Sequence, residues 1–189
     1  MSKEQHAPGA LERVRAFVNT IDIEQDAEQL EEPAALAGWL VEHQLAPRGL
    51  RATHDDLDHA LELREALRAL LLAHNGAAPE PAQALEALDD AVCRANVRLR
   101  FRAGGEASLE PQADGVPGAL GRLLVIVQAA VADGSWPRLK ACREHACEWA
   151  FYDHTRNHSG AWCNMRVCGN RAKARAFRQR QSRGSLESH

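Results

Sequence analysis

The chain has 189 residues, which is enough for one ordinary domain and a small additional module. Hydrophobic residues make up 45% of it and aromatic residues 5%, a composition that favours a helical core built from Ala and Leu. The N-terminal residues lack the apolar segment of a secretory signal, and no apolar run approaches 18 residues. We therefore expect a soluble, cytoplasmic protein without a membrane span.

The formal net charge of −3 conceals a strong polarity along the chain. Residues 1–135 carry 12 Lys/Arg against 22 Asp/Glu, a formal −10, whereas residues 136–183 carry 11 against 3, a formal +8; Glu187 supplies the last −1. An acidic body with a basic C-terminal end indicates a polyanionic partner for that end alone. The alternative is that the two oppositely charged parts attract only each other.

Helical spacing of apolar residues accounts for most of the N-terminal two thirds of the chain. Pro33 suits the first position of a helix, and Thr53 with Asp56 forms an N-cap with acids in the first turn. We expect helices over about 10–20, 33–46, 54–74, 79–95 and 118–132.

One hairpin is the only strand signal in this part of the chain. Val97–Phe101 alternates apolar and basic residues, Gly104 and Gly105 can make a turn, and residues 107–109 can return as the partner strand. The acidic stretch 21–32 is expected to be a loop.

Several side chains in the helical part of the chain can have either a functional or a structural role. Asn19 can be a ligand, but we expect it to be buried and to satisfy backbone groups. Arg64 and Arg68, one helical turn apart, can bind an anion, but pairing in solvent with neighbouring glutamates is the simpler expectation. Cys93 lies alone on its helix and is expected to be a buried thiol.

Four cysteines in the last third of the chain form two pairs with equal spacing. Four residues separate Cys142 from Cys147 and Cys163 from Cys168, and fifteen residues separate the pairs. Two such loops can place four thiolates around one tetrahedral zinc ion, and four cysteines leave no open position for catalysis. Disulfides and unliganded thiols are the alternatives. Histidines within the module could replace one ligand: His145, His154 and His158.

A basic helix is expected directly after the last cysteine. Gly169 fits a turn that needs a positive φ, and Arg171, Arg175 and Arg178 then fall on one helical face. Beside them, Ala174 and Phe177 form a short apolar stripe that can lean on the zinc core. The metal would thus fix one end of a helix that presents arginines to a nucleic acid.

The C-terminal third resembles the CGNR zinc-finger family. The matching landmarks include the motif Cys168-Gly169-Asn170-Arg171, the pair Trp162-Cys163, and Lys173 with its following arginines. The chain departs from the family at Ser159-Gly160-Ala161, where basic residues are often found, which weakens the case for phosphate contacts from that loop. The resemblance covers residues 136–180 and implies a zinc-stabilised nucleic-acid-binding module.

The N-terminal part is similar to the ABATE domain, a family described as stress-induced transcription regulators. The stretches that carry this resemblance are Phe17–Asp22, Leu36–Leu40 and Asp56–Leu71. Together the two resemblances imply an ABATE-like helical domain over 10–134 and a CGNR-type domain over 136–183. The fold class expected is mainly α, with one small hairpin and a treble-clef or ribbon-like four-cysteine module that ends in the basic helix.

No catalytic constellation is evident, so the chain is not expected to be an enzyme. Two function classes remain: a zinc-binding transcription regulator on DNA, with RNA as a variant because zinc ribbons also stack single-stranded bases, and a protein-interaction module without nucleic-acid binding. Trp162 can support stacking, although Trp149, Phe151 and Trp162 also suit a small hydrophobic core. An effector or protein partner of the N-terminal domain is conceivable. The predicted nucleic-acid contacts are Asn170, Arg171, Lys173, Arg175, Arg178 and Arg180.

Overall fold

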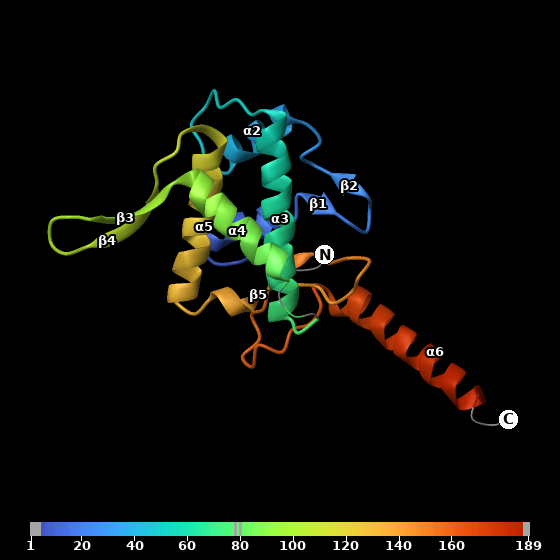
Figure 1. The fold of residues 1–189 in the computed structure, drawn as a ribbon. Helices are drawn as coiled ribbons and strands as arrows, with labels where there is room; N and C mark the ends of the chain where they lie inside the picture. The colour runs from blue at the N-terminus through green and yellow to red at the C-terminus, as the bar shows by residue number, and fades with distance from the viewer. Residues whose placement is uncertain (1–4, 78, 80, 187–189) are drawn as a thin grey trace.

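A computed structural model describes residues 5–77, 79 and 81–186, with side chains as far as residue 179 (Figure 1). Five helices form the body: α1 (Leu11–Val18), α2 (Pro33–Glu42), α3 (His54–His74), α4 (Ala82–Ala95) and α5 (Gly115–Ala132). A sixth helix, α6 (Asn170–Leu186), extends away from the body at the C-terminal end. The mainly α fold predicted from the sequence is confirmed.

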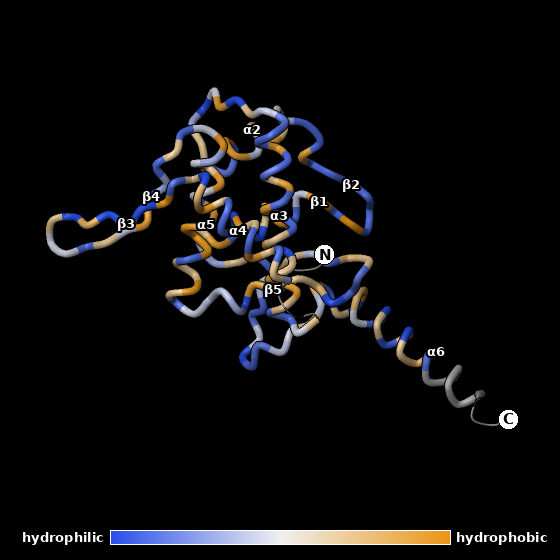
Figure 2. Tube along the Cα trace, in the orientation of Figure 1, coloured by the Kyte–Doolittle hydropathy of each residue, from blue (hydrophilic) through white to orange (hydrophobic). Residues whose placement is uncertain are grey.

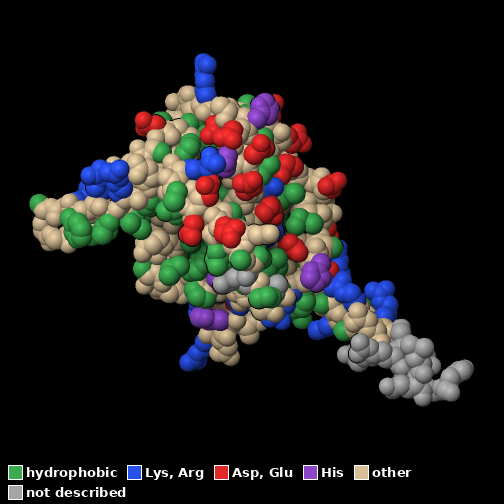
Figure 3. Space-filling model, in the orientation of Figure 1, with side chains coloured by type: hydrophobic (Ala, Val, Ile, Leu, Met, Phe, Trp, Pro, Cys, Tyr) green, Lys and Arg blue, Asp and Glu red, His purple; other side chains and the backbone are tan. Residues whose placement is uncertain are grey.

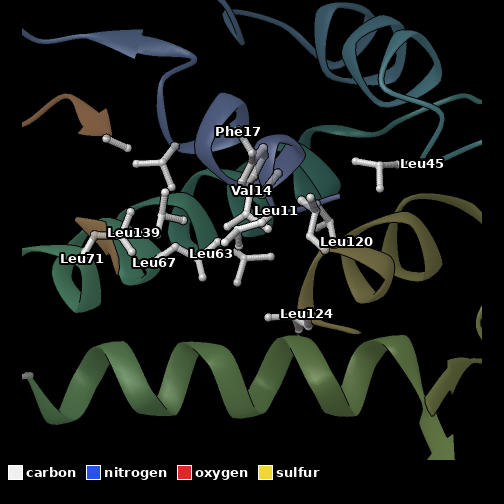
Figure 4. Close-up of a cluster of buried hydrophobic side chains, with 14 of the residues drawn as sticks. Leu11, Val14, Phe17, Leu45, Leu63, Leu67, Leu71, Leu120, Leu124 and Leu139 are labelled. Atoms are coloured by element: carbon white, nitrogen blue, oxygen red, sulfur yellow. The ribbon is translucent and has the colours of Figure 1, made fainter. Parts of the chain in front are cut away.

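The central helix α3 begins as its sequence predicts. The Thr53 side chain accepts a hydrogen bond from the Asp56 backbone N–H, and the Asp56 carboxylate accepts one from the Thr53 N–H, which completes a capping box. Along one face of α3, Leu63, Leu67 and Leu71 are buried against α1 and the strand β5 (Leu139–Ala141; Figure 4). The capping box thus fixes the exposed N-terminal end of α3, and the leucine face fixes the rest of the helix in the core.

Helix α5 is a strongly apolar element of the body (Figure 2). By length and composition it could cross a membrane, which differs from the expectation that no segment of the chain is long and apolar enough. Core helices of soluble proteins have the same character, and 44% of α5 is buried. Its inward residues, such as Leu120 and Leu123, pack in the core that it shares with α1, α3 and α4.

Two small antiparallel hairpins belong to the body, where the sequence predicted one. Strands β3 (Val97–Phe101) and β4 (Ala107–Pro111) pair with Leu99 opposite Leu109, so this hairpin is confirmed. Strands β1 (Ile21–Asp22) and β2 (Ala27–Glu28) form a second, two-residue hairpin within the stretch expected to be a loop. It is short and acidic, so its sequence lacks the alternation that marks a strand.

The last third begins with a 3-10 turn, η1 (Trp136–Arg138), followed by the paired strands β5 (Leu139–Ala141) and β6 (Ala150–Tyr152). Every residue of both strands is buried, and the main hydrophobic core includes Leu139 (Figure 4). After Trp162 and Cys163 the chain runs into a π-helical turn, η2 (Met165–Gly169). One continuous core therefore joins the helices to the β5–β6 hairpin.

Three side-chain expectations for the body are wrong. Arg64 and Arg68 are buried, at 4% and 3% exposure, and are not solvated. Arg64 donates to the Thr20 hydroxyl and the Glu28 carboxylate, while Arg68 donates to two backbone carbonyls, those of Val18 and Glu148. Glu65 does pair with both arginines, as expected. Cys93, expected to be buried, is exposed.

Candidate zinc centre and basic helix

The four cysteine sulfurs converge on one point, and three of the four cysteines are buried. All four Sγ atoms lie within 4.8 Å of one another, with 3.6 Å between Cys147 and Cys163 and 3.7 Å between Cys163 and Cys168. Ligands about 2.3 Å from a tetrahedral zinc ion are about 3.8 Å apart, so this spacing is the one that zinc requires. The four cysteines fit one structural zinc ion, as the sequence predicted.

The pKa values of the cysteine thiols also indicate that a cation belongs between these sulfurs. Hydrogen bonds from the Cys147 and Cys163 thiols lower the pKa of Cys142 to about 2, while its neighbours raise the pKa of Cys163 far above the ordinary range. Four thiolates at this separation repel one another too strongly to ionise together unless a positive ion lies between them. When bound, zinc supplies that charge and crosslinks the two loops.

The first cysteine loop is a tight turn that follows β5. The Cys147 N–H donates to the Glu144 carbonyl at 2.8 Å, and Glu148 adopts a positive φ of 47° to leave the turn. Cys142 is itself held by a hydrogen bond from its N–H to the Trp149 carbonyl. The loop thus presents Cys142 and Cys147 on one side of the zinc position.

The second loop is organised by Asn164. Its side-chain oxygen accepts from the N–H groups of Arg166 and Val167, and its carbonyl accepts from the Cys168 N–H at 2.9 Å. This caps the π-helical turn that carries Cys168. Asn164 was not singled out by sequence reasoning, although an Asn immediately before a helical turn is a recognisable capping signal.

Gly169 has a different role from the one expected. It is not among the glycines with a positive φ; it lies in the helical turn η2. A Cβ at this position would be 2.4 Å from the Met165 Sδ and 3.2 Å from a ring carbon of Trp162. Glycine is therefore used here for the close approach of these side chains.

Two tryptophans cover the cysteine cluster. Trp149 and Trp162 are half-buried and pack against the cysteines, and Phe151 is fully buried in β6. This arrangement supports the reading of these aromatics as the small core of the module. Within the described residues the metal-binding group contains the four cysteines and no histidine. His145 is 85% exposed, and His154 contacts the backbone of His6.

A buried ion pair stabilises the β5–β6 hairpin and the loop that follows it. The Lys140 ammonium lies 2.8 Å from the Asp153 carboxylate, and both side chains are at most 5% exposed. Burial opposes ionisation of Asp153, but hydrogen bonds from Lys140 and Thr155 prevail and lower its pKa to about 2. Since Lys140 also donates to the carbonyls of His158 and Gly160, the pair fixes the loop that leads to Cys163.

Two arginines of α6 are tied back to the rest of the molecule. Arg175 forms a bidentate ion pair with the buried carboxylate of Glu144, with Nη1–Oε1 and Nη2–Oε2 distances of 3.0 and 2.7 Å. Arg171 pairs with Glu24 in the β1–β2 turn at 2.6 Å. Glu144 lies between the first two cysteines, so the first zinc loop sets the direction in which α6 leaves the body.

The face of α6 expected to lean on the zinc core is turned outward. Ala174 and Phe177 are exposed, Phe177 by 54%, whereas the arginine face contacts Glu24 and Glu144. The prediction of an apolar stripe against the core is therefore wrong. Charge pairing orients this helix.

The remaining predicted nucleic-acid residues lie along the same helix. Lys173 and Arg178 are exposed, and the Asn170 side chain donates to the Arg166 carbonyl at 2.9 Å. The Arg180 side chain lies outside the described residues. Figure 3 shows Lys and Arg gathered at the start of α6, and the described part of the helix, residues 170–179, contains no acidic residue.

Comparison with protein families identifies both parts of the chain. Residues 12–134 match the ABATE family, whose description reads "Putative stress-induced transcription regulator". Residues 138–181 match the CGNR zinc finger. The chain therefore belongs to the ABATE family, with the ABATE domain followed by a CGNR zinc finger, as the sequence motifs implied. A search of curated proteins finds no match.

Proposed function

We propose that this protein is a DNA-binding transcription regulator in which the zinc centre holds α6 as the nucleic-acid-binding element. The observation that carries the proposal is the direct continuation of η2, which contains Cys168, into a basic helix that projects from the body (Figure 1). A helix that projects beyond an acidic body can enter a groove without bringing that body against the phosphates.

The charges of the described part of α6 support this role. Arg171, Lys173, Arg175 and Arg178 supply four positive charges over eight residues. Lys173 and Arg178 are exposed, and we assign them to the primary phosphate contacts. Arg171 and Arg175 also pair with carboxylates of the body. Asn170 is engaged with the backbone, and we assign it to the stability of the helix start.

RNA is the second polymer to test, since the protein would bind it through the same charges. Single-stranded RNA is usually held by aromatic stacking, and the module's tryptophans are half-buried over the cysteines. Phe177 is the exposed aromatic side chain of α6 among the described residues. This distribution of aromatic side chains favours a helix that contacts phosphates over one that stacks on bases, and therefore favours duplex DNA as the partner.

The experiment is fluorescence anisotropy of zinc-loaded protein with random-sequence duplex DNA and single-stranded RNA of equal length. The test variant is Lys173→Ala/Arg178→Ala. The matched control is Arg48→Ala/Arg51→Ala, which removes two exposed positive charges between α2 and α3. We expect tighter binding to the duplex, about tenfold weaker binding for the test variant, and wild-type binding for the control. Equal loss in both variants would contradict the assignment to α6.

We also propose that the chain acts in the cytoplasm. We further propose that it has no catalytic activity, because neither the sequence motifs nor the closed four-cysteine centre offers a reacting group. A zinc-ribbon module that binds only a protein is the alternative function. Absence of binding to either polymer by zinc-loaded protein would favour it.

A further inference from the structure

The β3–β4 hairpin projects from the body as an arm with two unlike faces (Figure 1). Because side chains alternate along a strand, the cross-strand register places one apolar set on a single face: Val97, Leu99, Phe101, Ala107, Leu109 and Pro111. The other face of β3 carries Arg98 and Arg100. Leu99 is 56% exposed and Phe101 is 76% exposed, which is unusual for large apolar side chains.

The root of the arm, where β3 and β4 meet the body, is in close contact with α4 and α5. The backbone N–H groups of Gln112 and Ala113 both donate to the Ala95 carbonyl at 3.1 Å. At Gly121 in α5, a Cβ would come within 3.0 Å of both Ala95 and Pro111, so helix and arm are in close contact there. The arm is thus held in a set direction, with its apolar tip away from the core of its own chain.

The body carries a second apolar surface that is also uncovered. On α4, Leu85 and Val92 are two turns apart on one face and are 45% and 39% exposed. On α5, more than half of an apolar helix is unburied, and Val131 is 56% exposed. Figure 3 shows hydrophobic side chains along the arm and on the adjoining flank of the body. We use the name α4–α5 surface for these exposed residues of the two packed helices, Leu85, Val92 and Val131.

The charges beside these two surfaces are complementary. Arg98, Arg100 and Arg102 make the polar face of the arm basic, although Arg102 pairs with Glu110, Arg100 donates to Gln112 and Arg98 donates to Asn96. Acidic residues on α4 flank the α4–α5 surface, namely Glu86, Asp89 and Asp90, and Asp90 is paired with Arg94.

We propose that the arm binds the α4–α5 surface of a second copy of this chain, and that the two copies exchange arms in a symmetric dimer. Each copy offers both an arm and a receptor surface, so one two-fold axis satisfies both contacts. Phe101 and Leu99 pack on Leu85 and Val92 of the partner copy, and the arm arginines lie near the acids of its α4. A two-stranded hairpin is marginal by itself, and this contact covers its apolar face. The dimer is independent of the nucleic-acid function.

Sedimentation equilibrium without nucleic acid tests the proposal. Between about 1 and 100 µM, we expect wild-type protein to pass from monomer to dimer, with a dissociation constant near 10 µM. Leu99→Ser/Phe101→Ser is expected to stay monomeric at 100 µM. The control Phe177→Ser removes an exposed aromatic ring from α6 and is expected to dimerise like the wild type. Far-UV circular dichroism verifies that each variant is folded.

Mixing two variants tests whether the arm reaches across copies. The body variant Leu85→Asp/Val92→Asp is expected to be monomeric alone. Mixed with the arm variant, it retains one intact arm and one intact receptor surface, so heterodimers form at about 100 µM. Wild-type protein that remains monomeric, or a mixture that forms no heterodimer, overturns the proposal. So does a monomer that binds phosphatidylcholine vesicles through Leu99 and Phe101, because a lipid surface would then be the occupant.

Discussion

The side chain of Asn19 pairs with both backbone groups of Ala150, 131 residues away. Its Nδ2 donates to the Ala150 carbonyl at 2.9 Å, and its Oδ1 accepts from the Ala150 N–H at 2.8 Å. All of these atoms are buried. The amide takes the place of a neighbouring strand for β6, and it joins the end of α1 to the zinc-binding part.

Asn19→Ala is therefore expected to destabilise the protein by about 2–4 kcal/mol. It leaves the buried N–H of Ala150 without a partner, and the Ala150 carbonyl keeps only the 3.4 Å hydrogen bond from Arg15. Urea unfolding of zinc-loaded protein measures this. The control is Asn157→Ala, which removes an exposed amide and should change stability by less than about 0.5 kcal/mol. Equal effects of the two substitutions would show that the bridge contributes nothing.

Removal of zinc is expected to loosen residues 142–169 while the helical body remains folded. The hydrophobic contacts around the cysteines are few, comprising chiefly Trp149 and Trp162, whereas the helices share a large core. Thiolates left without a cation repel one another, so the loops should open. After chelation, amide hydrogen exchange should accelerate in 142–169 and stay slow in α3. Unchanged exchange in the cysteine loops would mean that zinc is not structural.

The ion pair between Glu28 and Arg64 is expected to make stability depend on pH. Burial raises the pKa of Glu28, but hydrogen bonds from Arg64 and from the Leu30 N–H outweigh it, and the pKa is lowered from 4.5. A carboxyl with a lower pKa in the folded chain stabilises the fold above its unfolded pKa. That contribution is lost as the pH falls below about 4.5.

Glu28→Gln measures this contribution directly. We expect it to cost about 1–3 kcal/mol at pH 7, because Arg64 is buried and loses one of its two carboxylate partners. The difference in unfolding free energy between wild type and variant should shrink between about pH 5 and pH 3. A difference that does not change with pH would rule out an ionised Glu28 as its cause.

Two glycines in helices are expected to respond in opposite ways to alanine. At Gly121 a Cβ would come 2.5 Å from Ala95 and 3.0 Å from Pro111, so Gly121→Ala should cost about 1–3 kcal/mol. At Gly38 in α2 nothing lies within 4 Å, so Gly38→Ala should stabilise by about 0.5–1 kcal/mol. Thermal unfolding of both variants tests the packing at the root of the arm.

The features that sequence predicted well depend on local chemistry. The capping box at Thr53 and Asp56 and the equal cysteine spacing each involve residues close in the chain, so their pattern determines their structure. The burial of Asn19 was also predicted correctly. Its partner was not, because Ala150 is distant in the chain and carries no signal of its own.

The errors at Arg64, at Arg68 and in α6 share a physical cause, which is contact with distant segments. Arg64 and Arg68 have the spacing of a solvated helix face, but the β1–β2 hairpin and the zinc-binding part cover that face. In α6, apolar periodicity favoured Ala174 and Phe177 as the inward side. Glu24 and Glu144, supplied by two separate loops, instead turn the arginines inward.

The most direct test of the zinc-held basic helix is the salt dependence of duplex DNA binding. Each phosphate contact contributes about 0.9 to the slope of log K against log salt concentration. We expect Lys173→Ala/Arg178→Ala to lower the magnitude of that slope by about 2 relative to zinc-loaded wild type, with the metal content unchanged. A variant that binds DNA with the wild-type slope would contradict the assignment of α6 as the nucleic-acid-binding surface.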